Sequence, residues 1–198
     1  SGAWEGPRLV TSGPSFNGNT VSSAEQGAQR VAEQVEAGYD FLKIHPGLER
    51  DEFISIATAA KEAGIPIAGH VSFQTGVHTA LDHRQDCIDH LDGYAQAMVP
   101  EDSEFHGVAP SWFGLNLADG IDSSRAAALA KQTALAGVWN APTQSLFETT
   151  SSDVSLSDLL ARPGMEYLSE DLREDWRNAV RNIRSQTTIE QRAAFLDA

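Results

Sequence analysis

Cysteine and long apolar runs are the first things that this sequence lacks. Its 198 residues include one cysteine, Cys87, so no disulfide can form within the chain. Cys87 stands in the apolar run DCIDHL, where we expect a small buried hydrophobic residue and not a nucleophile. No run of about 18 apolar residues occurs, so no segment is predicted to span a membrane. The N-terminal SGAWEGPR lacks the pattern of a signal peptide, and Ser1 to Ala3 are expected to remain from an expression tag. Localisation is therefore left open.

Basic residues are also scarce. Lys and Arg number 14 against 28 Asp and Glu, which gives a net charge of -14 and a pI of about 4.7. A field of this sign argues against nucleic acid or an anionic membrane as a partner, because both need clustered Lys and Arg. The acidic residues are dispersed, as in SEDLREDWR, which is typical of solvated helix faces. The chain length and a hydrophobic share of 41% suit one globular domain over residues 1–198.

No glycine-rich nucleotide-binding motif follows any apolar run, which removes the main support for a nucleotide-binding fold. The apolar runs alternate instead with amphipathic segments, and this order predicts parallel strands joined by crossover helices. The fold class is therefore α/β, either an open doubly wound sheet or a TIM (β/α)8 barrel. Five strands are too few to close a barrel, and the chain ends on a helix with no strand after it, so we expect a partial barrel, an internal fragment. The five expected strands are Pro7–Gly13, 40–45, 65–71, 86–91 and 138–143.

Helix signals separate these runs. Capping boxes at Ser22-x-x-Glu25 and Thr187-x-x-Glu190 predict two helix starts. Gly38, Gly64 and Gly137 are the expected stops of three helices. The segment 98–116 carries two prolines and no sustained period, so we expect a long loop there.

Lys43 stands in the middle of the second strand, between Leu42 and Ile44. An ammonium group is costly to bury without a partner, so Lys43 either reaches solvent at a strand end or takes part in chemistry. His70 and His90 lie at or near the ends of the next two strands. Each of the three residues alone has a structural explanation. Because the carboxyl ends of barrel strands meet on one face, the three together predict a ligand set there.

An ammonium group has no lone pair and cannot bind a metal. A lysine of lowered pKa can instead react with CO2, and the carbamate that results is an anionic oxygen ligand able to bridge two cations. Neutral imidazoles suit zinc and similar divalent metals. Lys43, His70 and His90 are thus the candidate metal residues.

Six segments resemble, in order and spacing, the metal-dependent amidohydrolase superfamily, in particular its imidazolonepropionase-like and Xaa-Pro dipeptidase (prolidase)-like branch: GPRLVTSGP, AGYDFLKIHPGL, AGIPIAGHV, DCIDHLDG, AGVWNAPTQSLFE and MEYLSEDLREDW. The resemblance implies that the five strands correspond to family strands 3 to 7. It also implies that Lys43 is the carbamylated lysine, that His70 and His90 are metal ligands, and that the intact protein holds two zinc ions.

The chain departs from the family pattern at two places. No His-x-His pair occurs, although the family carries one on strand 1. The family's strand 8 aspartate, the general base, is expected beyond Ala198, so we assign no catalytic residue within this chain. Lys43 is therefore expected here as a free lysine near water or a carboxylate.

Four further residues are candidate substrate contacts. His45 follows Lys43 by two positions and so shares its strand face, although it could simply cap the loop. His106 lies in the long loop with Phe105 and two other aromatic residues, as in a substrate lid, although an ordinary packed loop has the same composition. Thr143 and Gln144 follow the last strand and could line a pocket.

These observations predict a fragment of a metal-dependent hydrolase that acts on amide, peptide (Xaa-Pro-like) or cyclic amide C–N bonds through a metal-activated hydroxide. The partner would be a small amide or dipeptide. The isolated chain is expected to be inactive and homo-oligomeric, since missing strands would leave sheet edges bare. Two alternatives stay open, a non-catalytic structural or oligomerisation module and an α/β anion-binding protein in which Lys43 acts as a point charge.

Overall fold

The computed structural model describes residues 6–197, in two compact units. Among the described residues, the first unit comprises residues 6–93 and 127–141, and the second comprises residues 94–126 and 142–197. The expected tag remnant, Ser1 to Ala3, lies outside the described residues. That residues 1–198 form a single domain stays a prediction.

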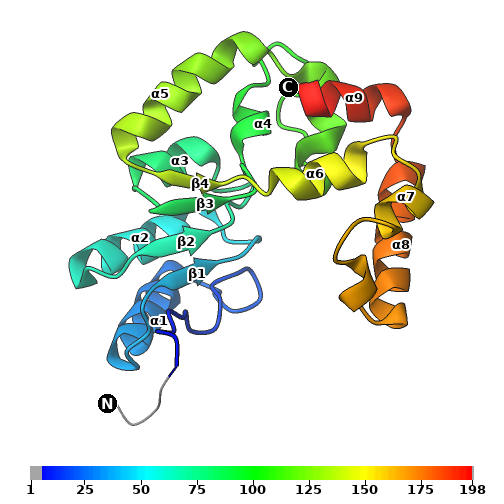
Figure 1. Cartoon of the computed structure of the whole chain (residues 1–198). Coiled ribbons are helices and arrows are strands. Elements are labelled where there is room, and N and C mark those ends of the chain that lie inside the picture. The colour runs from blue at the N-terminus through cyan, green and yellow to red at the C-terminus, as the bar shows by residue number, and fades with distance from the viewer. Residues whose placement is uncertain (1–5, 198) are drawn as a thin grey trace. The chain divides into compact units, whose positions relative to one another are not determined.

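The first unit is built on a parallel sheet of four strands, which lie in the order β1-β2-β3-β4 (Figure 1). A helix stands between each strand and the next along the chain, so the predicted α/β class and parallel arrangement are confirmed, and the sheet is consistent with part of a barrel. The strands are Leu42–Ile44 (β1), Ile67–Gly69 (β2), Cys87–Asp89 (β3) and Trp139–Ala141 (β4).

The prediction of five strands is wrong, because Pro7–Gly13 does not form one. This segment runs beside β1 and makes one isolated parallel bridge, Ser12 with Phe41, and a second bridge follows it at Phe16 with Ile44. Pro14 lies between the two bridges and has no N–H to donate, so the ladder is interrupted there. Upstream of the bridges, Leu9 is 81% exposed and gains little from pairing.

The helices of the first unit begin and end close to their predicted signals. Gly64 ends α2 in a left-handed conformation, with φ 68°, as a glycine stop should. The start of α1 is shifted by one residue, because Ser23 and not Ser22 accepts the hydrogen bond from Gln26 N–H. These helices are α1 (Ala24–Glu36), α2 (Arg50–Ala63), α3 (Val77–Asp82) and nearly all of α5 (Ala126–Ala136).

The core of the first unit uses alternate strand positions. Leu42, Ile44, Ile67 and Ile88 are at most 3% exposed, whereas Lys43 between the first two is half-buried. Burial of each such side chain stabilises the fold by about 2 kcal/mol. The alternation divides the sheet into an apolar face, which joins the core, and a second face that carries polar side chains. We call the second face the polar face.

The second unit is helical. Segment 98–116, predicted as a loop, ends in the 3-10 helix η1, and residues 144–151 form the helix α6. Thr188 caps the last helix, one residue after the predicted cap, because it accepts from the Gln191 N–H at 3.1 Å. The elements are α4 (Tyr94–Ala97), η1 (Trp112–Gly120), η2 (Ser123–Arg125), α6 (Gln144–Ser151), α7 (Leu156–Leu160), η3 (Met165–Tyr167), α8 (Glu170–Ser185) and α9 (Ile189–Asp197).

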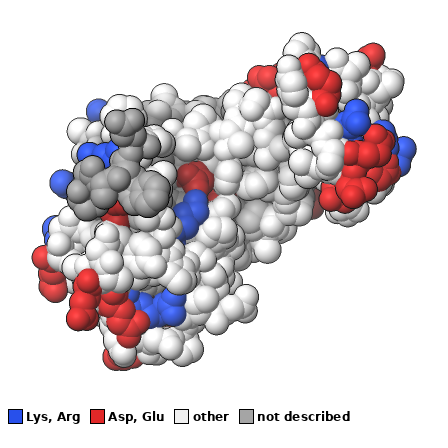
Figure 2. All heavy atoms as spheres, turned by 60° about the horizontal axis from the view of Figure 1, so that its bottom comes forward, with Lys and Arg blue, Asp and Glu red and all other residues white. Residues whose placement is uncertain are grey.

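Charged side chains of α8 pair along the helix surface. Arg173 contacts Glu170 at 2.9 Å, and Glu174 contacts both Arg177 and Arg181. On the face that Figure 2 draws, basic side chains lie next to acidic ones and do not form a large basic patch. The segment SEDLREDWR is therefore a solvated helix face, as predicted.

Among the described residues, no helix combines the length and apolar content that crossing a membrane requires.

Gly69, the last residue of β2, permits the closest backbone approach in the sheet. Its φ is 133°, and a Cβ built there would lie 2.2 Å from the carbonyl oxygen of Ile44 and 2.8 Å from its nitrogen. Real Cβ atoms do not approach a backbone oxygen so closely. Only glycine therefore fits at position 69, directly before His70, where β2 lies against the backbone of β1.

We expect Gly69→Ala to lower the free energy of unfolding by about 2 to 4 kcal/mol, because a backbone clash adds to the conformational cost. Gly38→Ala is the matched control. Gly38 has φ 78° but no atom within 4 Å of a built Cβ, so it should lose only about 1 kcal/mol. Urea unfolding followed by circular dichroism compares the two. Equal losses would contradict the steric explanation.

Candidate metal centre

Lys43 lies on the polar face of the sheet. Its register partner on β2 is Ala68, and Ala68 in turn pairs with Cys87 on β3. Side chains in register share a face, and positions two apart on a strand do so too. Asp89, two residues after Cys87, is therefore on the same face as Lys43.

The ammonium of Lys43 forms an ion pair with the Asp89 carboxylate, Nζ to Oδ2. The two side chains are 26% and 19% exposed, so the pair is only partly screened by solvent. The carboxylate supplies the partner that a half-buried ammonium requires. Lys43 thus stands beside a carboxylate, one of the two surroundings expected from the sequence.

Three histidines follow three successive strands by one residue each. His45 comes after β1, His70 after β2 and His90 after β3. The ring centroids of His45 and His70 are 5.0 Å apart, and those of His70 and His90 are 4.8 Å apart. The carboxyl ends of the strands thus bring together Lys43 and all three imidazoles.

His90 reaches this group through an unusual backbone conformation. Strand alternation alone would turn it away from the polar face, because it directly follows the polar-face residue Asp89. Its φ is 59°, in the left-handed region, and the strand ends there. Its N–H donates to the carbonyl of Ala141 at 2.8 Å, which still ties it to β4. The turn of the backbone is therefore what gathers the ring beside His70.

His70, Asp89 and His90 form the candidate metal centre. One possible ligand atom of each lies within 4.8 Å of the others, and all three residues are half-buried. Among residues 6–197 this is the one group of three or more His, Cys, Asp or Glu side chains with such spacing. Two imidazoles with one carboxylate are a donor set that zinc accepts, and three protein ligands leave a position for water or substrate. The residues present therefore fit a divalent metal.

Neighbouring groups hold His70 in place. Its Nδ1 lies 2.7 Å from Oδ2 of Asp92, and the side chains are 15% and 12% exposed. The fully buried amide of Gln85 donates to the carbonyls of Gly69 at 2.9 Å and Cys87 at 3.1 Å. Gln85 therefore joins the end of β2 to the start of β3, the two strands that carry the centre.

Burial lowers the pKa of both His45 and His90 from their ordinary value, and the electrostatic interaction with nearby His70 lowers each further. Lys43 acts on both in the same direction, whereas Asp89 opposes the shift. Both imidazoles are therefore neutral near pH 7, the form that can bind a metal or accept a proton. Burial raises the pKa of the half-buried Cys87, so its thiol is a poor nucleophile, in line with the sequence-based expectation.

Sequence reasoning missed Asp89, Asp92 and Gln85. Asp89 could have been found, because alternation along DCIDHL puts Cys87 and Asp89 on one face. Nothing in the sequence marks Asp92 or Gln85, whose partners come from other segments. The remaining predicted substrate contacts lie in the second unit: His106 is exposed, Thr143 precedes α6 with φ 57°, and Gln144 begins that helix. Their role stays a prediction.

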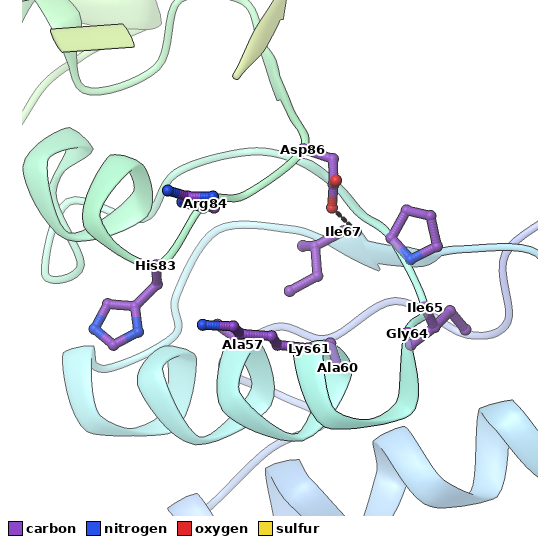
Figure 3. Close-up of a pocket in the computed structure, with 10 residues that line it drawn as sticks. Ala57, Ala60, Lys61, Gly64, Ile65, Ile67, His83, Arg84 and Asp86 are labelled. Carbon is purple, nitrogen blue, oxygen red and sulfur yellow. Dashed lines mark hydrogen bonds between the residues drawn. The ribbon is translucent and has the colours of Figure 1, made fainter. Parts of the chain in front are cut away.

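A hollow of the first unit, of about 330 Å³, lies at the end of the strands opposite the candidate metal centre (Figure 3). It is bordered by residues 64–67 at the start of β2 and by Asp86 before β3. The Asp86 carboxylate accepts the N–H of Ile67 at 2.8 Å, so this acid fastens the two strand starts together. Lys61, His83 and Arg84 line the rest of its polar wall, and none of the candidate metal ligands does.

Comparison with known proteins gives a likeness in three dimensions. Neither protein-family models nor curated proteins match the sequence. Among solved structures, bottromycin amidohydrolase is similar, with a TM-score of 0.53 and 22% sequence identity over 89% of this chain. The chain spans 37% of the length of that protein. At this identity the likeness bears on the fold, and it agrees with a partial barrel-like α/β arrangement.

The two lowered histidine pKa values predict how stability depends on pH. The unfolded state binds protons near the ordinary pKa of about 6.5, before folded His45 and His90 do. The free energy of unfolding that the two neutral histidines contribute is therefore fully present above that pH and falls as the pH drops through it. We expect the free energy of unfolding of the metal-free chain to decline from pH 7.5 to 5.5 in chelator-containing buffer.

His90→Asn should flatten this decline, since Asn tolerates a left-handed backbone but does not titrate. His45→Asn should flatten it in part. Urea unfolding at several pH values provides the measurement. A slope that neither variant changes would show that other groups control the pH dependence.

Proposed function

We propose that this chain carries the metal-binding part of a hydrolase that cleaves amide C–N bonds with a divalent cation. The observation that carries the proposal is the His70–Asp89–His90 group at the carboxyl ends of β2 and β3. In parallel α/β folds, ligands bind at those ends of the strands. The fold likeness to an amidohydrolase supports the same reaction class.

Each residue of the group has a distinct part in holding the cation. His70 and His90 offer imidazole nitrogens, and Asp89 offers a carboxylate oxygen that also carries the Lys43 ion pair. The ammonium partly neutralises the carboxylate and fixes its direction. A bound divalent metal would polarise an amide carbonyl and make water nucleophilic near neutral pH.

His45 borders the group and is exposed, unlike its half-buried neighbours. Its lowered pKa leaves a neutral imidazole at neutral pH. Such a ring accepts a hydrogen bond or a proton from a substrate that approaches over the polar face. We therefore assign His45 to substrate contact, as the sequence suggested.

The finer features of the function come from the family resemblance. They are a small amide, Xaa-Pro-like dipeptide or cyclic amide as substrate, a second zinc ion and a carbamylated Lys43. The described residues offer one three-donor group, which supports one cation. Homo-oligomerisation and inactivity of the isolated chain likewise stay predictions.

Zinc titration of the 198-residue chain, by calorimetry, tests the proposal. We expect one zinc per chain, and a loss of roughly a hundredfold in affinity for His70→Ala, Asp89→Asn or His90→Ala, because each removes a donor from a three-ligand site. His78→Ala is the matched control. His78 is exposed on α3, where it bonds Gln132, and its loss should leave the affinity unchanged.

The same titration separates the alternatives. A chain that binds no zinc and whose free energy of unfolding rises with added phosphate would favour the hypothesis of an α/β anion-binding protein. A chain that responds to neither would favour a structural module. Equal loss in His78→Ala and His70→Ala would mean that the zinc bound elsewhere.

The Lys43–Asp89 ion pair generates a separate prediction. If Lys43 remains an ammonium, zinc affinity should not depend on bicarbonate, because no carbamate forms. Titration with and without added 13C-bicarbonate, with 13C NMR of the zinc-loaded chain, provides the measurement. A carbamate resonance that disappears in Lys43→Gln would show that Lys43 becomes a ligand.

A further inference from the structure

The five residues Asp89–Gly93 form a tight turn after β3, and its backbone is strained. His90 and Leu91 have φ values of 59° and 56°, two consecutive non-glycine residues in the left-handed region. Such a conformation is unfavourable for a residue with a side chain and persists where the surrounding structure requires it. The N–H of Asp92 closes the turn on the carbonyl of Asp89 at 3.1 Å.

The packing at Gly93 shows how closely this turn fits the unit. Its φ is 84°, and a Cβ built there would lie 2.9 Å from Cβ of Val77 and 3.0 Å from its nitrogen. Val77, at the start of α3, is itself 2% exposed. The turn is therefore seated against a buried helix end and has little freedom to relax.

The consequence of the turn is the position of Asp92. Its carboxylate contacts His70, which directly follows the neighbouring strand β2, with Oδ2 at 2.7 Å from Nδ1. Both side chains are largely shielded from solvent, at 12% and 15% exposure. A contact of this length is within the range of a hydrogen bond between an imidazole N–H and a carboxylate oxygen.

An ionised carboxylate can only accept a hydrogen bond, so Nδ1 of His70 must carry the hydrogen. In the neutral imidazole this leaves Nε2 with its lone pair. A neutral imidazole in water prefers the opposite arrangement, with the hydrogen on Nε2. The carboxylate therefore selects which nitrogen is open to a cation.

We propose that Asp92 is a positioning residue that holds His70 with its hydrogen on Nδ1 and so presents Nε2 to the metal. The second half of this inference rests on the proposed function, whereas the first half concerns the metal-free chain alone. Asp92 is not a member of the candidate ligand group. It acts through His70.

The state of His70 is measured directly in the metal-free chain at pH 8 by 15N and 13C NMR of labelled histidine. The His70 resonances are those that His70→Asn removes. We expect the Nδ1–H form in the native chain. Asp92→Asn should shift His70 toward the Nε2–H form, because an amide can also donate. Asp92→Glu keeps an acceptor and should restore part of the Nδ1–H population.

Zinc affinity provides the second readout. Asp92→Asn should weaken zinc binding about 10- to 100-fold, the usual cost of losing such a partner, and Asp92→Glu should weaken it less. Asp82→Asn is the matched control. It removes the same charge from an exposed position on α3 and should leave both zinc affinity and the His70 spectrum unchanged. Circular dichroism establishes that each variant is folded.

The outcomes separate the two proposals. A native His70 in the Nε2–H form, or a tautomer and an affinity that Asp92→Asn does not change, would overturn the role of Asp92. A chain that binds no zinc but loses the Nδ1–H form in Asp92→Asn would support that role and contradict the metal-dependent function.

Discussion

The close approach of β1 and β2 at Gly69 is the constraint on which the centre depends. The His70 N–H donates to the Ile44 carbonyl at 3.0 Å, directly after a glycine whose Cβ would collide with that residue. This bond sets the register of the two strands and fixes where the His70 ring leaves the sheet. Gln85 extends the same constraint to β3 by bonding carbonyls of both strands. The site is thus held by backbone contacts of the sheet.

Around this frame, polar and charged groups occur in cross-strand pairs. Lys43 pairs with Asp89, and His70 pairs with Asp92. Partly buried polar and charged groups are costly unless each has a partner, and these pairs meet that requirement. The same arrangement leaves imidazole nitrogens and a carboxylate oxygen close together on the polar face. Stability and ligand capacity therefore come from one set of side chains.

Much of the first unit follows from local patterns in the sequence. Apolar alternation and glycine stops locate the helices and four of the five expected strands, because burial and backbone conformation act over a few neighbouring residues. Pro7–Gly13 has a strand-like composition but does not enter the sheet, since Pro14 breaks its ladder with β1. The starts of two helices, at Ser23 and Thr188, differ from the prediction by one residue. Neighbouring polar residues can cap each helix equally well, and the backbone conformation determines which one does.

Local patterns also place Lys43, His70 and His90 at the carboxyl ends of successive strands, and parallel pairing brings such ends together. Local patterns do not predict which side chains pair with one another. Asp89 meets Lys43 across 46 residues of chain, and Asp92 meets His70 across 22. Those contacts require the strand register and the left-handed turn at His90 and Leu91, which alternation does not predict. The types and order of the site residues are thus a property of the sequence, while their pairing exists only once the strands lie side by side.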